Sequence, residues 1–260
     1  VAGNKPYFPL VMSYRHQWTG FTDNPRTMLL SMHGELKKNI SVGGVIFSDR
    51  TGPTGRTGLL AAYSYHLPMG KNKVAFGLSM MGFQYSLDKS KLTTDQPGDN
   101  AIQGGKVTQI VPEATFGMFY YGKNYYAGFS TPQLIQMRVK VGGSEVLNRM
   151  VRHYFVTGGY KYAVNNDYAI EPSFLLKATV AAPVQIDLNS RFYYKEMVWL
   201  GLSYRAKESV IIMAGMKKDI YSMGYSYDAT LTNIKNYSSG SHEIFIGVDL
   251  FKKKQKASFD

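Results

Sequence analysis

The chain repeatedly alternates apolar and polar side chains with a period of two, which is the spacing of a β-strand. In the segment 184–194, the apolar face carries Val184, Ile186, Leu188, Phe192 and Tyr194. The same alternation recurs in the segments 198–205, 221–228 and 243–250. A soluble core would bury such faces against another layer, and the sequence offers no helical segment to supply one. Lipid against the apolar faces and a polar lumen against the others would account for both.

About fourteen segments show this strand character, each bounded by clusters of Gly, Pro, Asn, Asp or Lys. Most have ten or more residues, whereas a soluble strand typically has about five or six and a membrane strand needs about 9–11. The predicted strands are 8–18, 26–36, 40–50, 56–67, 73–87, 113–121, 125–131, 152–164, 168–179, 184–194, 197–206, 209–217, 221–230 and 241–251.

The connections between these segments largely alternate between tight turns and longer links. Outer-membrane barrels have short periplasmic turns, longer outer loops and an even number of strands. The predicted fold is therefore all-β: a transmembrane antiparallel up-and-down β-barrel of about 14 strands, integral to the bacterial outer membrane. We find no linker, so we expect residues 1–260 to form one domain, with 252–260 as a periplasmic tail.

Composition excludes several other classes of protein. No stretch approaches the ~20 apolar residues of a membrane helix, and the mean hydropathy is −0.22. Cysteine is absent, and the five histidines are scattered without metal-ligand spacing. No Gly-x-Ser-x-Gly string is present, so we expect no enzyme, metal or cofactor, and a barrel lipase is the remaining enzymatic alternative. Residues 1–4 do not resemble a signal peptide, so we expect a processed or trimmed chain.

The alternation turns a set of charged side chains toward the predicted lumen. Charges in a confined interior persist when they are paired or hydrated, so these residues either form an ion-pair lattice that stiffens the barrel or bind a ligand or peptide. The set consists of Glu171, Lys177, Asp187, Arg191, Arg205 and Asp228, with Lys161, Glu243 and Asp249 nearby on the wall.

The net charge of +12 is concentrated at the tight turns, which places it on the periplasmic rim. Such lysines either contact phospholipid headgroups or bind an acidic periplasmic partner. Nucleic acid is not expected, because the lysines are not interleaved with aromatic residues on one face. The predicted rim residues are Lys37, Lys38, Lys71, Lys195, Lys217 and Lys218.

Two of the longer links, 88–112 and 132–151, exceed what a hairpin needs. Links of this length are usually functional or disordered, and Pro97-Gly98-Asp99 and Pro132 favour an ordered lid or binding loop. Together with the link 231–240 they give the candidate cargo-binding residues Asp95, Pro97, Gly98, Asp99, Asn100, Gln136, Arg138 and Tyr237.

A series of short sequence motifs also extends over nearly the whole chain. They include Tyr14-Arg15-His16-Gln17-Trp18, Asp49-x-x-Gly52-Pro53-Thr54, Asp95-x-Pro97-Gly98-Asp99, Ala182-Pro183-x-Gln185-x-Asp187, Trp199-Leu200-Gly201-Leu202-Ser203-Tyr204-Arg205, Gly224-Tyr225-x-Tyr227-Asp228 and Tyr237-x-Ser239-Gly240-Ser241-His242-Glu243. Together they resemble the PorP/SprF family of Bacteroidota outer-membrane proteins. One departure is that the family's opening segment, which contains Asn-Pro and ends in Ala-Gly, is represented only by Ala2-Gly3.

The resemblance implies a role in the type IX secretion system and its gliding apparatus. Family members are associated with secretion and surface attachment of adhesins that carry a type B C-terminal domain, and with periplasmic lipoprotein and ring components. The expected function is therefore to anchor, or help export, such an adhesin. The alternative is an outer-membrane diffusion channel or a transporter of small hydrophobic substrates, which conductance in planar bilayers would distinguish.

Overall fold

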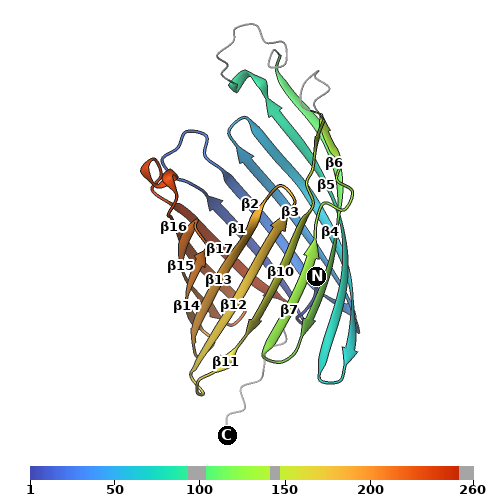
Figure 1. Ribbon diagram of the computed structural model, residues 1–260. Helices are drawn as coiled ribbons and strands as arrows, with labels where there is room; N and C mark the ends of the chain where they lie inside the picture. Colours follow the sequence, from blue (N-terminus) through green and yellow to red (C-terminus); the bar gives the residue numbers. More distant parts are fainter. Residues whose placement is uncertain (93–103, 141–146, 252–260) are drawn as a thin grey trace.

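The computed structural model describes residues 1–92, 104–140 and 147–251, which form a closed antiparallel β-barrel (Figure 1). Fifteen strands form one sheet, and β10 and β11 are separated only by Lys161 and pair with the same strand, so the wall has fourteen strands. In order they are β1 (Phe8–His16), β2 (Arg26–Lys37), β3 (Ile40–Thr51), β4 (Thr54–Met69), β5 (Asn72–Asp88), β6 (Lys106–Tyr121), β7 (Tyr125–Thr131), β10 (His153–Tyr160), β11 (Tyr162–Ala163), β12 (Tyr168–Thr179), β13 (Ala182–Tyr194), β14 (Val198–Arg205), β15 (Ser209–Lys218), β16 (Tyr221–Thr230) and β17 (Ser241–Leu250).

The barrel closes where the two ends of the chain meet. Strand β1 pairs with β17 from Phe8↔Leu250 to His16↔His242, and each other wall strand pairs with its sequence neighbours. Outside the wall, β8 (Arg138–Lys140) and β9 (Leu147–Arg149) form a two-stranded sheet, and two short 3-10 helices, η1 (Lys89–Lys91) and η2 (Asn233–Asn236), lie in outer connections. Among the described residues, no helix is long and apolar enough to cross a membrane.

The apolar alternation covers the outside of the wall, as predicted. Along β13, Val184, Leu188 and Phe192 are exposed outward, and Asp187 between them is buried on the inside. Large apolar side chains on other strands are similarly bare, with Leu59 61% exposed and Ile212 59% exposed. A soluble protein would rarely leave so continuous an apolar surface in water, whereas lipid is its natural solvent.

Some predicted boundaries were wrong. Strand β6 begins at Lys106 and β5 continues to Asp88, so the predicted link 88–112 spans only 89–105. Pro112 lies inside β6, at a position where its missing amide would face away from β5. The predicted strand 152–164 is interrupted at Lys161, and the predicted tail 252–260 lies outside the described residues.

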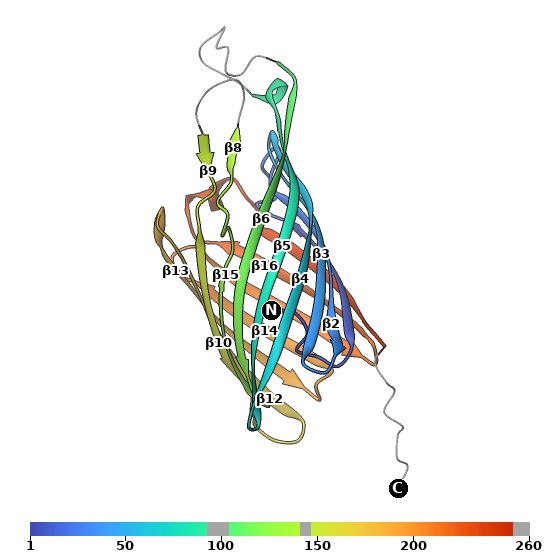
Figure 2. The same cartoon turned by 90° about the vertical axis from the view of Figure 1, so that its right-hand side faces the viewer.

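The N-terminal residues lie inside the barrel. In both views the N-terminus falls within the outline of the wall, and residues 1–5, called here the N-terminal strap, follow the inner faces of β2 to β6 (Figures 1 and 2). Residues 1–5 thus lie in the lumen, and β1 of the wall begins at Phe8.

Candidate functional site: the lumen and outer mouth

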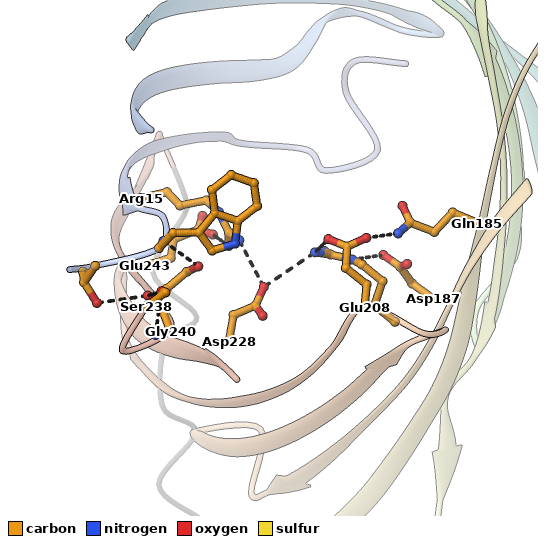
Figure 3. A network of polar contacts seen from close by, with 12 residues as sticks. Arg15, Gln185, Asp187, Glu208, Asp228, Ser238, Gly240 and Glu243 are labelled. Carbon is orange, nitrogen blue, oxygen red and sulfur yellow. Dashed lines mark hydrogen bonds and ion pairs between the residues drawn. The ribbon is translucent and has the colours of Figure 1, made fainter. Parts of the chain in front are cut away.

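An ion network joins the inner faces of β1, β12 to β14, β16 and β17 near the outer end of the barrel (Figure 3). Asp228 is buried, accepts a hydrogen bond from Arg15 Nη2 at 3.1 Å and forms an ion pair with Arg205 Nη1 at 3.6 Å. Asp187, also buried, lies 2.8 Å from Lys177 Nζ and 3.4 Å from Arg205 Nε. The network is completed by Arg15 with Glu243 at 3.4 Å, Arg205 with Glu208 at 3.2 Å, and a hydrogen bond from Gln185 to Glu208.

Two outer connections cover this network. The amide of Trp18 donates to the Ser241 hydroxyl at 3.1 Å, and the amide of Thr19 donates to the Gly240 carbonyl at 2.8 Å. The amide of Ser239 returns a bond to the Thr19 carbonyl at 2.7 Å. The links 17–25 and 231–240, at opposite ends of the sequence, therefore form one cap over the seam between β1 and β17.

Beneath this cap lies a small polar cavity of about 190 Å³, lined in part by Trp18, Arg205, Glu208 and Asp228. Its charged groups already satisfy one another, because each guanidinium faces at least two carboxylates. The network therefore resembles a set of ion pairs that link the strands to one another more than an open ligand site.

On the opposite wall, the chain after β7 folds into the lumen. Residues 132–139, called here the inner segment, pass next to Glu113 of β6, whose side chain is turned inward and is 1% exposed. Its carboxylate accepts hydrogen bonds from the amides of Met137 at 2.9 Å and Ile135 at 3.3 Å. A buried carboxylate with two backbone donors fixes the path of this segment.

An apolar cluster holds the same segment against the inner wall. Val139 packs with Phe83 and Val111, and all three side chains are buried. The partly buried Met137 and Met150 also pack against this cluster. Arg152 anchors the far end through a 2.9 Å hydrogen bond to the Leu134 carbonyl. Apolar contacts and backbone hydrogen bonds thus make the described part of this connection an ordered structure in the outer half of the lumen.

The N-terminal strap occupies the lumen wall further down. Its Ala2 carbonyl accepts from the Ser64 hydroxyl at 2.7 Å and lies 2.9 Å from His66 Nε2, and its Gly3 amide donates to His33 Nδ1 at 3.1 Å. Gly3 has φ +78°, and a Cβ there would lie 2.0 Å from the Cβ of Ser41. The strap therefore depends on glycine at this position.

The predicted luminal residues do not form one cluster. The ion network includes Lys177, Asp187, Arg205 and Asp228. Glu171 instead accepts from the Tyr193 hydroxyl at 2.9 Å, and Arg191 lies over the Trp199 ring at 5.0 Å. Nearby, Lys161 pairs with Glu196 at 2.5 Å.

The predicted loop residues lie in different places. Gln136 is in the inner segment and accepts from Arg149 at 3.0 Å, while Arg138 is exposed at the start of β8. Tyr237 is 73% exposed and contacts the Phe21 ring in the cap. The candidates Asp95, Pro97, Gly98, Asp99 and Asn100 lie outside the described residues.

The predicted rim residues lie at the turns, with one difference. Lys37, Lys38, Lys71, Lys195 and Lys218 are exposed. Lys217 is turned inward instead, where its Nζ lies 2.6 Å from Asp249 and over the Tyr7 ring at 5.6 Å. The alternation of β15 explains this, because consecutive residues face opposite sides of a strand.

The roles of Glu113 and of the N-terminal strap were not predicted from the sequence. The partners of Glu113 are backbone amides 22 and 24 residues away, which no side-chain motif records. For the strap, Gly43, Gly77 and Gly117 on β3, β5 and β6 were an available signal, because each leaves room for Ala2 or Val1.

Comparisons with known proteins agree with this architecture. A family model described as type IX secretion system membrane protein PorP/SprF matches residues 1–248. No curated protein sequence matches. Among solved structures, the Acinetobacter baumannii outer membrane protein Omp33 is 7% identical, with 95% of this chain and 100% of that chain covered and a TM-score of 0.56. The KdgM porin is 9% identical over 92% of this chain and 99% of that chain, with a TM-score of 0.45. The first likeness concerns the fold alone.

Proposed function

Because the chain belongs to the PorP/SprF family of type IX secretion system membrane proteins, we propose that it anchors, or helps export, a surface adhesin by binding the adhesin's type B C-terminal domain. The chain is an integral β-barrel protein of the outer membrane. Its outer mouth is the part that faces the cell surface, since the short turns of such barrels face the periplasm.

The ordered outer mouth supports this proposal best. A diffusion channel needs a clear lumen, whereas here the inner segment, the N-terminal strap and the ion network all lie within the barrel. The buried Glu113 and the apolar cluster hold the inner segment in place, with Arg138 of that segment and the neighbouring Arg149 exposed. Preorganised surfaces bind with a smaller entropic cost than mobile ones, which suits a docking platform.

Charge reversal on this surface tests the proposal. Replacing Arg138→Glu and Arg149→Glu together should lower the amount of adhesin held at the cell surface about tenfold, because both side chains are exposed and carry charge toward a partner. The measurement is the surface adhesin of intact cells at equal barrel abundance. Arg50→Glu with Arg56→Glu is the matched control, since these exposed arginines flank the β3–β4 turn. Equal adhesin in both variants would contradict the assignment.

At the periplasmic end, we propose that the exposed rim lysines bind an acidic lipoprotein or ring component of the secretion system. Replacing Lys37, Lys38 and Lys218 by Glu should reduce co-precipitation of periplasmic components several-fold. The reduction should become larger as the salt concentration falls, because salt screens exposed charges. Lys217 is kept, because its pair with Asp249 belongs to the lumen. Unchanged co-precipitation would mean that the lysines contact only lipid headgroups.

The diffusion-channel alternative makes an opposite prediction in planar bilayers. With the strap and inner segment in place, we expect the purified barrel to show no unitary conductance steps. Regular open steps under the same conditions would favour a channel.

A further inference from the structure

At the outer end of β6, one edge is not paired with any of the described strands, and it is called here the open edge. It pairs with β5 along its whole length, from Lys73↔Tyr121 to Asp88↔Lys106. On its other side it pairs with β7 only from Phe116↔Thr131 to Tyr121↔Tyr126, because β7 ends at Thr131. Beyond this, Ala114 still accepts from the Leu134 amide, after which the chain turns inward. Among the described strands, none pairs with Lys106–Pro112 on the side away from β5. Figure 2 shows β5 and β6 rising above the neighbouring wall.

The register identifies the backbone groups on this open edge. In an antiparallel ladder, alternate residues direct their amide and carbonyl to the same side. The Ala114 carbonyl and the Gly122 amide both bond toward β7, so the even-numbered residues of β6 face away from β5. The open edge therefore presents the amides of Ile110, Thr108 and Lys106, which are spaced about 6.6 Å apart. Pro112 falls in the same series and has no amide to leave unpaired.

This edge begins where the membrane should end. A membrane strand needs about 9–11 residues, so a span counted outward from Tyr121 ends near Val111. Within lipid, each unpaired backbone group costs several kcal/mol. The last residue of the span that faces away from β5 is Pro112, which has a carbonyl but no amide on that side. The amides from Ile110 outward are therefore in water, where a bare strand edge is a template for pairing with another chain.

The surroundings of the open edge are basic. Lys91, Lys106, Arg138 and Arg149 are exposed on η1, β6, β8 and β9, and Gln109 of β6 donates to the Arg138 carbonyl at 3.1 Å, which ties β8 to the same place. Of the nearby carboxylates in the part of the chain that the structure describes, Glu113 is buried and accepts from two amides, and Asp88 accepts from Ser90 in the cap of η1. An incoming strand would gain most if it carried acidic side chains.

We propose that the open edge of β6, residues Lys106–Pro112, captures an extended acidic strand of a partner protein by β-augmentation. This rests on the proposed function, in which the partner is the C-terminal domain of the exported adhesin. Backbone hydrogen bonds to Lys106, Thr108 and Ile110 supply the attachment, and the basic residues around the edge select acidic strands.

Proline substitution tests the proposal in cells. Thr108→Pro with Ile110→Pro removes two edge amides while repeating the situation already tolerated at Pro112, so the β5–β6 ladder should remain intact. We expect at least a fivefold loss of surface adhesin. Folding of the barrel, measured by the shift in gel mobility on heating, should be unchanged. The control, Thr108→Val with Ile110→Val, keeps both amides and should retain adhesin. Retention in the proline variant would overturn the edge proposal.

A second measurement does not depend on these variants. The purified wild-type barrel is mixed with a ten-residue peptide that alternates Glu with Val or Thr. Hydrogen exchange of the barrel's amides is measured and compared with their exchange in the presence of a control peptide that carries Lys in place of Glu. At least tenfold protection of the Thr108 and Ile110 amides by the acidic peptide alone is expected, and no protection would overturn the proposal. Surface adhesin that persists in cells lacking the whole barrel would instead reject the proposed function.

Discussion

Replacing Glu113 by Ala should release the inner segment from the lumen wall. The change removes the acceptor of the Ile135 and Met137 amides from a site that is 1% exposed. Each buried donor left unpaired costs about 1–3 kcal/mol, so the two together should favour opening by at least about 2 kcal/mol, or about 30-fold. Trypsin cleavage after Arg138 in the folded barrel measures this, since proteolysis follows the population of the open form.

Glu113→Gln provides the matched comparison. Glutamine keeps one acceptor oxygen in a side chain of nearly the same shape, so it should accelerate cleavage less than alanine does. Cleavage at the wild-type rate in the alanine variant would show that the apolar contacts of Val139 with Phe83 and Val111 suffice to hold the segment.

Replacing Gly3 by Val should expel the N-terminal strap. A Cβ at this position would lie 2.0 Å from the Cβ of Ser41, and a β-branched residue is strained at φ +78°. Ser64 reports the result, because it is fully buried and donates to the Ala2 carbonyl. The chain contains no cysteine, so Ser64→Cys introduces a single thiol. We expect maleimide to label it at least tenfold faster when Gly3→Val is present.

The control for the strap is Gly44→Ala. The nearest atom to an added Cβ at Gly44 is the Leu60 carbonyl oxygen at 3.7 Å, which is ordinary contact. Labelling of the Ser64→Cys thiol should therefore stay slow with Gly44→Ala. Equal labelling rates in the Gly3→Val and Gly44→Ala backgrounds would mean that the strap does not shield this part of the wall.

The wall of the barrel was predictable because one physical pattern repeats in it. Each strand must turn apolar side chains to lipid and polar ones to the lumen, so residues such as Val184 and Asp187 record their side of the wall in the sequence. The ends of the strands were harder to predict. Residues 106–112 were assigned to the link 88–112, yet they lie in β6 and extend beyond the part of that strand that pairs with β7.

The interior was less predictable for a different reason. The alternation places Arg191 and Arg205 on the same inner face, but only contacts with distant strands decide that Arg205 joins Asp228 while Arg191 stacks on Trp199. Lys217 likewise belongs to a turn in sequence and to an internal ion pair in space. The inner segment and the strap depend on backbone hydrogen bonds and on missing side chains, which leave little trace in residue type.

Gentle detergent extraction of the barrel from native outer membranes, followed by mass spectrometry of what remains bound, tests the central proposal most directly. We expect a surface adhesin with a type B C-terminal domain at an amount comparable to the barrel, and its loss from the Arg138→Glu, Arg149→Glu variant. A barrel that emerges intact without any cell-surface protein would contradict it.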